Sequence, residues 1–371
     1  MAQSDNLAAI QNCLSNSLGG VAIGNKAIAG VLGDAPSQYS KSPRLWNAAF
    51  DQLGLEAVYL PFDIAAERLG ELIAQFKKSP RFWGANVTVP HKVRVMDFLD
   101  EIDPGARRVD AVNTIVRTAA GRLIGYNTDG EGFIASLLRP QEDRAEGFIP
   151  SLDGIDVLLL GAGGSARAVA FHTADLLGAG TLLICNRTLD HAASLADGLK
   201  KNGRSAAVIG ETELSRYASA VGLIINSTTK GQAGIRKLPD GTVTKLEPYS
   251  ALAPVHPPTL AESELVDPNF ARRWAEAAEA DIEANHRASL ALADSIPSHV
   301  RFYDLIYHPE ETVFLRHGRI TGHPTLNGKA MIINQAVIAF ANHICRAHLE
   351  GHGMDPITAH KKLLRIMERA W

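Results

Sequence analysis

The sequence predicts an α/β protein built from two α/β domains. The chain has 371 residues, which is about the length of two domains. Apolar segments typical of strands alternate along it with segments that have the period of amphipathic helices. A glycine-rich turn near the middle of the chain, between an apolar strand and a helix, separates two such halves. We therefore expect two sheets with helices, and a cleft between the domains.

The first half begins with an extension and then shows strands and helices in turn. Residues 1–26 are expected to form an N-terminal extension, with one short amphipathic segment from Leu7 to Leu18. Strands are expected at Ala27–Gly33, Ala57–Ile64, Asn86–Val89, Val112–Val116 and Leu123–Tyr126, the last two forming a hairpin. Helices are expected from Ser42 to Gly54, from Ala65 to Phe76, after Pro90 and from Gly130 to Leu138. In the first of these helices, Ser42 is the expected N-cap and Pro43 the first helical residue.

The central glycine-rich turn predicts a dinucleotide site. Val157 to Leu160 is an unbroken apolar run, typical of a strand buried on both faces. It is followed by G-A-G-G-S-A and by a helix that ends near Gly178. This order places backbone N–H groups and the positive helix end around a pyrophosphate. The sequence thus predicts a Rossmann-type doubly wound parallel sheet, with cofactor-binding residues Gly161, Ala162, Gly163, Gly164 and Ser165. An ordinary tight turn is the alternative, because the bare motif is weak.

The second half continues with strands and helices, interrupted by one long segment. The other elements expected are strands at Thr181–Cys185, Ala206–Ile209, Gly222–Asn226 and Phe302–Tyr307, and helices at Thr188–Lys201, at Lys329–His348 and after Asp355. The segment from Lys230 to Val300 is longer than a loop needs and predicts a helix from Asn269 to about Ala293. We interpret this segment as a surface insertion; an oligomer arm and a lid over the cofactor are the alternatives.

Composition and charge narrow the class of protein. Hydrophobic residues make up 46% of the chain and charged residues 21%, as in ordinary soluble proteins, and the net charge of −3 comes with no basic patch. Cys13, Cys185 and Cys345 lack metal-ligand spacing, which favours a reducing compartment and no metal site. Residues 1–20 lack the pattern of a signal peptide, and the apolar run Met331–Ala341 is too short to cross a membrane. We expect a cytoplasmic protein with a small-molecule substrate and no nucleic-acid or membrane partner; a homodimer stays open.

Polar side chains gather at the expected ends of strands in the first half. Asn86 and Thr88 lie on one face of a strand, because side chains alternate, and Lys92 follows its end. Asn113 lies in the expected hairpin and Asp129 at its exit. Such groups suit a polyhydroxylated ligand. Each also has an ordinary alternative, since lysines are mostly solvated and Asp129 can cap the next helix.

Two further groups of residues are suited to binding an anion. Ser40 and Ser42 place hydroxyl groups at the expected N-terminus of a helix, which suits a carboxylate, although capping is the ordinary role of such a serine. Asn186-Arg187-Thr188 follows a strand at the position where an NAD site usually has an acidic residue. An arginine there suits the 2′-phosphate of NADP, so Arg187 favours NADP over NAD. A surface arginine beside a helix cap at Thr188 is the alternative.

Motifs along the chain resemble those of the shikimate dehydrogenase family. In order, they are Y-S-K-S-P (39–43), G-A-N-V-T-V-P-H-K (84–92), A-V-N-T (111–114), G-Y-N-T-D-G (125–130), G-A-G-G-S-A-R (161–167), N-R-T (186–188), Y-D-L-I-Y-H-P (303–309) and N-G-K-A-M-I-I-N-Q-A (327–336). The resemblance runs from about residue 27 to 340, apart from the insertion. One such motif is weak, but the whole series in this order is specific.

The resemblance implies an activity and a set of roles. The family reversibly reduces 3-dehydroshikimate to shikimate with NADPH, in the pathway that leads to aromatic amino acids. It implies that Lys92 is the catalytic lysine and Asp129 its partner in proton transfer. The residues implied to bind substrate are Ser40, Ser42 and Tyr307 at the carboxylate, and Asn86, Thr88, Asn113, Asp129 and Gln335 at the ring hydroxyls. The residues implied to bind NADP are the glycine turn, Asn186, Arg187 and Thr188, with Met331 beside the nicotinamide.

Several positions depart from the family pattern. Tyr39 and Trp46 stand where histidines are frequent, which we expect to alter the rim of the substrate pocket. His191 stands where NADP-using members often have a second basic residue, so the 2′-phosphate site rests mainly on Arg187. The other departures, both at common glycines, are Asp110 and Ala330.

The alternatives to an NADP-dependent shikimate dehydrogenase are an NAD-preferring quinate/shikimate dehydrogenase and a non-catalytic NADP-binding regulatory relative. Ser40 and Ser42 favour shikimate, and the presence of both Lys92 and Asp129 argues against the regulatory protein. A glutamyl-tRNA reductase needs a nucleophilic cysteine in its first domain, where only Cys13 is available, so we exclude it. The expected domains are residues 1–129 with 328–371, which bind substrate, and residues 130–327, which bind NADP and carry the insertion at about 230–300.

Overall fold

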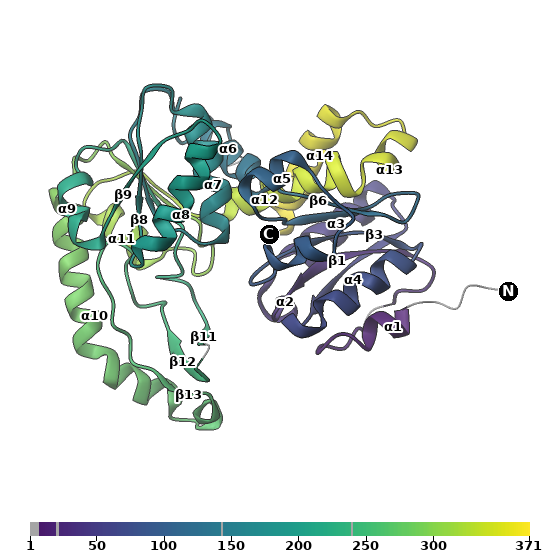
Figure 1. The fold of residues 1–371 in the computed structure, drawn as a ribbon, viewed down its shortest axis with the longest axis horizontal. Helices are drawn as coiled ribbons and strands as arrows, with labels where there is room; N and C mark the ends of the chain where they lie inside the picture. Colours follow the sequence, from purple (N-terminus) through teal and green to yellow (C-terminus); the bar gives the residue numbers. More distant parts are fainter. Residues whose placement is uncertain (1–6, 20–21, 142–143, 239) are drawn as a thin grey trace. The chain divides into compact units, whose positions relative to one another are not determined.

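The computed structural model describes residues 7–19, 22–141, 144–238 and 240–371 (Figure 1). Parts of the expected N-terminal extension and one residue of the expected insertion lie outside these ranges. The chain forms two compact units, residues 1–147 with 330–371 and residues 148–329. The first unit therefore includes α6 (Asp129–Leu138), which the sequence assigned to the second domain. The reason is packing, because a Cβ atom added at Gly132 in α6 would lie 2.6 Å from the Cβ atom of Gln335 in α12 (Lys329–Ile338).

The first unit is built on a mixed six-stranded sheet with the order β2-β1-β3-β5-β6-β4. Its strands are β1 (Ala27–Gly33), β2 (Ala57–Asp63), β3 (Phe82–Val87), β4 (Glu101–Ile102), β5 (Thr114–Arg117) and β6 (Leu123–Tyr126). β1 pairs in parallel with β2 and β3, whereas β5 pairs antiparallel with β3 and with β6. The expected hairpin is therefore confirmed as β5 and β6.

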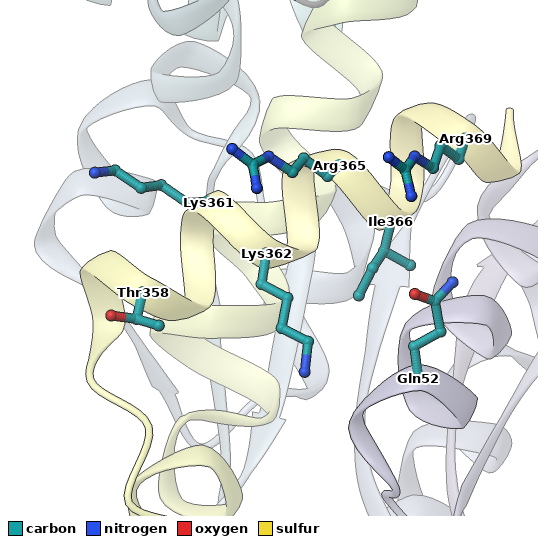
Figure 2. A pocket seen from close by; sticks show the side chains of 7 residues that line it. All are labelled: Gln52, Thr358, Lys361, Lys362, Arg365, Ile366 and Arg369. Carbon is teal, nitrogen blue, oxygen red and sulfur yellow. The ribbon is translucent and has the colours of Figure 1, made fainter.

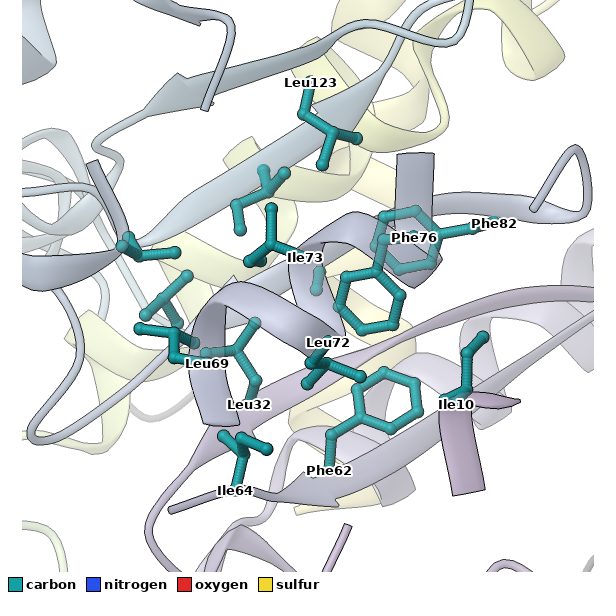
Figure 3. Packing of buried hydrophobic residues seen from close by; sticks show 14 of the residues in the cluster. Ile10, Leu32, Phe62, Ile64, Leu69, Leu72, Ile73, Phe76, Phe82 and Leu123 are labelled. Atoms are coloured by element: carbon teal, nitrogen blue, oxygen red, sulfur yellow. The ribbon is translucent and has the colours of Figure 1, made fainter. Parts of the chain in front are cut away.

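Helices cover both faces of this sheet, because side chains along β1 alternate between two cores. The remaining helices of the first unit are α1 (Leu7–Gln11), α2 (Pro36–Tyr39), α3 (Ser42–Leu53), η1 (Ala66–Arg68), α4 (Leu69–Lys78), η2 (Arg94–Phe98), α5 (Pro104–Val109), η5 (Ala339–Ile344), α13 (Arg346–Gly351) and α14 (Pro356–Ala370). Ile28 and Leu32 pack with α1 and α4, and Phe76 of α4 stacks on Phe82 of β3 in the same core (Figure 3). Ala29 packs on the opposite face with α3 and the C-terminal helices.

Three expected elements of the first unit differ in detail. The described part of the N-terminal extension is a packed element, because Ile10 is fully buried in the core of Figure 3. The segment after Pro90 forms turns and the short 3-10 helix η2 in place of an α-helix. The long helix expected at Lys329–His348 is broken by the π-helical turn η5 between α12 and α13.

The second unit has the expected doubly wound sheet, with the strand order β15-β14-β10-β7-β8-β9 and parallel pairing throughout. Its strands are β7 (Val157–Leu160), β8 (Leu182–Cys185), β9 (Ala206–Ile209), β10 (Leu223–Asn226), β14 (Arg301–Asp304) and β15 (Thr325–Leu326). Its helices include α7 (Gly164–Leu176), α8 (Leu189–Lys201), η3 (Glu211–Glu213), α9 (Leu214–Tyr217) and α11 (Val313–Ile320). The strand order reverses between β7 and β10, which is where ligands bind in folds of this kind.

The insertion is a structured part of the second unit. It contains a three-stranded antiparallel sheet and a long helix, formed by β11 (Ile235–Lys237), β12 (Thr242–Lys245), β13 (Leu260–Ala261), η4 (Glu262–Val266) and α10 (Phe270–Ser295). A small core around Tyr249 and Trp274 joins these pieces. The expected helix from Asn269 to about Ala293 is thus confirmed, and Figure 1 shows α10 running alongside β12 and β13. In the part of the chain that the structure describes, no helix is both long and apolar enough to cross a membrane.

Candidate active site

Lys92 and Asp129 form an ion pair at the end of the sheet in the first unit. Lys92 lies in the turns after β3, and Asp129 is the first residue of α6. The Lys92 Nζ atom is 2.6 Å from the Asp129 Oδ2 atom, and the two side chains are only 17% and 7% exposed. A lysine that is withdrawn from solvent and held by a carboxylate is placed to move a proton. The solvated alternative for Lys92 is therefore wrong.

Asn113 holds the second oxygen of the same carboxylate. Its Nδ2 atom donates to Asp129 Oδ1 over 2.8 Å, while its Oδ1 atom accepts a hydrogen bond from the backbone of Thr128. The carboxylate of Asp129 does not cap α6, because Asp129 is the first residue of the helix and the N-cap position is Thr128. Both carboxylate oxygens of Asp129 thus have a protein donor, and each retains a lone pair for a further donor such as a substrate hydroxyl.

Asn86 is held by a tyrosine that the sequence did not single out. The Tyr59 hydroxyl donates to Asn86 Oδ1 over 2.6 Å, and Asn86 Nδ2 donates to Thr114 Oγ1. Burial raises the pKa of the Tyr59 hydroxyl, and hydrogen bonds with Asn86 and Ser42 oppose this rise. Tyr59 faces the same core as Ala57 in β2, which in the sequence looks like an ordinary buried strand. Tyr59 reaches Asn86 only because β2 pairs with β1 and β1 pairs with β3.

The two serines lie at the start of α3, close to this group. The backbone N–H of Ser42 donates to Ser40 Oγ over 3.2 Å, and both residues are half-buried. The expected N-cap role of Ser42 is wrong, because the helix begins at Ser42 itself and its N-cap position is Lys41, whose side chain makes no capping hydrogen bond. Thr88 follows β3, and its methyl group approaches Gly33 so closely that a Cβ atom there would lie 2.4 Å from it.

Gln335 reaches the site from α12 in the C-terminal part of the first unit. Its Oε1 atom lies 3.4 Å from Asn113 Nδ2, and its backbone oxygen accepts from Thr128 Oγ1 over 3.2 Å. The structure therefore brings together seven predicted residues, directly or through Tyr59, Thr114 and Thr128: Ser40, Ser42, Asn86, Lys92, Asn113, Asp129 and Gln335.

The departures from the family pattern have different structural settings. Trp46 is fully buried and stacks on Tyr59 with ring centroids 4.7 Å apart, so it is a core residue and the expected place on the pocket rim is wrong. Tyr39 is 42% exposed, and its hydroxyl donates to Asp34. Asp110 has φ = 54° after α5. That left-handed conformation explains why glycine is common at this position.

The glycine turn of the second unit has the shape expected for a phosphate site. Gly161 has φ = 105°, and a Cβ atom there would lie 2.7 Å from the Ser227 hydroxyl. A Cβ atom at Gly163 or Gly164 would meet nothing within 4 Å, so the turn opens to free space at the first residues of α7. No side chain caps this helix. These observations fit a dinucleotide pyrophosphate.

The segment after β8 carries the other predicted cofactor residues. Asn186 Nδ2 donates to the backbone oxygen of Thr188, which precedes α8 and makes no side-chain cap. The Arg187 side chain is exposed, as is His191. Of the remaining predicted residues, Tyr307 belongs to the second unit and Met331 to the first. Burial raises the pKa of the Tyr307 hydroxyl.

A basic cavity of about 410 Å³ lies elsewhere on the first unit, between α14 and the end of α3 (Figure 2). Its lining residues are Gln52, Thr358, Lys361, Lys362, Arg365, Ile366 and Arg369. None of these belongs to the predicted site. Lys361, Arg365 and Arg369 follow a spacing of four along α14, which is typical of a solvated helix face.

Comparisons with known proteins agree with this geometry. The family model "Shikimate dehydrogenase substrate binding domain" matches residues 31–115, and the model "Shikimate / quinate 5-dehydrogenase" matches residues 143–239. Shikimate dehydrogenase (NADP(+)) of Desulforamulus reducens is 37% identical to the chain over 320 residues, which covers 85% of this chain and 89% of the relative. The enzyme of the same name from Symbiobacterium thermophilum is 36% identical and covers 84% of this chain and 87% of its own length.

Solved structures show the same likeness. Shikimate 5-dehydrogenase from Thermus thermophilus, in complex with NADP(H) and shikimate, is 26% identical with a TM-score of 0.61. The match covers 93% of this chain and 100% of that one. A shikimate dehydrogenase in complex with NADP+ is 28% identical, with a TM-score of 0.61 over 92% of this chain and 96% of the other. Sequence identity and coverage at this level show that the chain belongs to the shikimate dehydrogenase family.

Proposed function

We propose that this protein is an NADP-dependent shikimate dehydrogenase, which reversibly reduces 3-dehydroshikimate to shikimate. The observation that carries the proposal is the Lys92–Asp129 ion pair, joined through Asn113 to Gln335. The relatives of the chain bear this name, and the glycine turn and Arg187 suit NADP. Three buried, free cysteines support a reducing compartment, and we propose a cytoplasmic location.

In this proposal, Lys92 transfers the proton. The bound NADPH supplies a hydride to the carbonyl carbon. Lys92 Nζ donates a proton to the carbonyl oxygen during reduction and takes it back during oxidation. Asp129 holds the ammonium group in place and accepts a hydrogen bond from a neighbouring ring hydroxyl. A positioned acid or base of this kind contributes typically ~10²–10⁴-fold to the rate.

In this proposal, the amides and hydroxyls around the Lys92–Asp129 pair bind the substrate. Asn86 uses its oxygen for Tyr59 and its amide hydrogens for Thr114 and the backbone of Asn113, which leaves one lone pair for a ring hydroxyl. We assign Asn86, Thr88, Asn113 and Gln335 to the ring hydroxyls. We assign Ser40, Ser42 and Tyr307 to the substrate carboxylate, and Met331 to the nicotinamide.

The buried state of Cys13 argues against a cysteine-dependent reductase. The only cysteines of the first unit are Cys13 and Cys345, and burial raises the pKa of both thiols. A nucleophilic cysteine needs the opposite shift, toward the thiolate. The site therefore supports hydride and proton transfer without a covalent intermediate on the enzyme.

The decisive experiment measures initial rates with shikimate or quinate, each with NADP⁺ or NAD⁺, by the change in absorbance of the nicotinamide. We expect clear turnover of shikimate with NADP⁺. Turnover mainly with quinate or with NAD⁺ would instead make the protein the quinate/shikimate relative. Binding of NADPH with no turnover in any of the four mixtures would contradict the enzymatic function and favour the regulatory relative.

A further inference from the structure

Arg236 is an arginine of the insertion that lies beside the cofactor end of the second unit. It is the middle residue of β11 and pairs with Thr244 of β12. Its guanidinium donates to the hydroxyl of Thr229, which lies three residues after the end of β10. The start of the insertion thus stays close to the end of β10, where the strand order of the sheet reverses.

The order of the strands places Arg236 across from Arg187. β7 lies between β8 and β10, and its last residue, Leu160, pairs with Cys185 on one side and Asn226 on the other. The glycine turn follows β7, Arg187 comes two residues after β8, and Thr229 follows β10. Adjacent strands are about 4.8 Å apart, so the ends of β8 and β10 lie on either side of the turn within reach of two long side chains.

The electrostatics of the two arginines point to an anion. Arg236 is an exposed residue of β11 whose guanidinium is partly withdrawn from solvent. This partial desolvation lowers its pKa, and the positive charge of Arg187 lowers it further, so the two guanidinium groups act on each other. Among the described residues, neither arginine forms an ion pair with a carboxylate. Two neighbouring positive charges repel each other, and an anion bound between them offsets this repulsion because it attracts both. A phosphate monoester suits this arrangement, because arginine forks bind phosphate oxygens in pairs.

We propose that Arg236, together with Arg187, holds the 2′-phosphate of NADP and so determines the preference for NADP over NAD. This inference rests on the proposed use of a nicotinamide dinucleotide. In this proposal β11, at the start of the insertion, contributes a residue to the cofactor site as well as packing within the insertion. It also supplies a second cation where His191 offers only an imidazole in the first turn of α8.

The test compares Arg236→Gln and Arg236→Lys with the wild type and with Lys237→Gln. Lys237 is the matched control, because it is the next residue of the same strand and its side chain pairs with Glu262 of the insertion. Dissociation constants of NADPH and NADH are measured by nucleotide fluorescence. Adenosine 2′,5′-bisphosphate and AMP are then compared by calorimetry, so that the readout does not depend on turnover.

We expect Arg236→Gln to weaken binding of NADPH and of the bisphosphate about tenfold or more, the change that a lost charge-assisted hydrogen bond produces. Binding of NADH and AMP should change less than about twofold, Arg236→Lys should recover part of the loss, and Lys237→Gln should match the wild type. Equal losses for NADPH and NADH, or no loss for NADPH, would overturn the inference. Because these are binding measurements, a wild type that binds NADPH but does not oxidise shikimate would refute only the proposed activity.

Discussion

The Lys92 ammonium and the Asn113 amide bind opposite oxygens of Asp129, at 2.6 Å from Oδ2 and 2.8 Å from Oδ1. The carboxylate therefore cannot rotate without breaking one of two hydrogen bonds. This fixes the position of the lysine relative to Asn113 and, through Asn113, relative to Gln335. The group to which we assign proton transfer and the groups that we assign to the substrate hydroxyls are parts of one hydrogen-bonded unit.

Replacement of Lys92 tests the proton-transfer role. We expect Lys92→Ala to lower kcat for shikimate oxidation by about 10²–10⁴-fold, because the positioned acid or base is lost. NADPH binding should stay as in the wild type. Lys77→Ala is the matched control, since Lys77 also pairs with an aspartate, Asp100, over 2.8 Å but on the surface of the same unit. Near-normal turnover in Lys92→Ala, with the fold intact by circular dichroism, would mean that another group moves the proton.

Tyr59→Phe tests whether Tyr59 positions Asn86. The change removes the hydroxyl, which donates to Asn86 and also hydrogen-bonds Ser42, and leaves the ring for its stack on Trp46. Loss of the hydrogen bond to Asn86, worth about 0.5–1.5 kcal/mol, corresponds to a rise of ~2–10-fold in KM for shikimate, and loss of the contact with Ser42 acts in the same direction, with a smaller change in kcat. Tyr126→Phe, in β6 of the same sheet, is the control. Steady-state kinetics over a range of shikimate concentrations give both constants, and an unchanged KM in Tyr59→Phe would contradict the positioning role.

Gly132→Ala tests the contact between α6 and α12. The added Cβ atom would lie 2.6 Å from Gln335 Cβ and 2.7 Å from its backbone nitrogen, so α12 must shift. We expect a loss of about 1–3 kcal/mol in the free energy of unfolding, typical of overpacking, and a higher KM for shikimate as Gln335 moves. Gly351→Ala is the control, because a Cβ atom at Gly351 in α13 meets nothing within 4 Å. Urea unfolding measures the free energy of unfolding of both variants. Equal values would show that α6 and α12 accommodate the added methyl group without loss of stability.

Asp304 makes the stability of the second unit depend on pH. Burial raises its pKa to about 7, against the hydrogen bonds from Ile306, Thr312 and Asn226 that favour the charged form. Between the ordinary pKa of an aspartate and pH 7, the folded protein thus holds a proton that the unfolded chain releases. The free energy of unfolding should fall as pH rises across this window, by about 1.4 kcal/mol per unit at most, and level off above it.

Asp304→Asn isolates this effect. In the structure the Thr312 hydroxyl donates to Asp304 Oδ2. In the variant this hydroxyl can turn to accept from the new amide nitrogen, while the amide oxygen still accepts from Ile306 and Asn226, so the fold should be kept. From about pH 5 to pH 7, the wild type should lose roughly 2 kcal/mol relative to the variant. Urea unfolding followed by circular dichroism at several pH values measures the difference. A constant difference across this range would show that Asp304 is ionised throughout.

The sequence by itself determined the class of the fold and predicted most residues of the candidate site. Strand and helix periods, and the glycine turn after Val157–Leu160, depend on local backbone preferences, which act over a few residues whatever the rest of the chain does. For the same reason Asn86, Lys92 and Asp129 could be singled out, since each follows or ends a recognisable strand. The motifs then assigned their roles by resemblance to a family that the comparisons confirm.

The tertiary structure decided what depends on contacts between distant segments. Lys92 and Asp129 are 37 residues apart, and Tyr59 and Asn86 are 27 apart, so no local pattern could show that they touch. Trp46 looked like a residue of the pocket rim, but it is buried because α12 and η5 return to cover it through Phe340. Arg236 gave no local signal either, because the role that we propose for this exposed arginine depends on the strand order, which sets β8 and β10 on either side of the glycine turn. Which side chains are buried and which charges pair depends on how distant segments pack, so only the tertiary structure shows them.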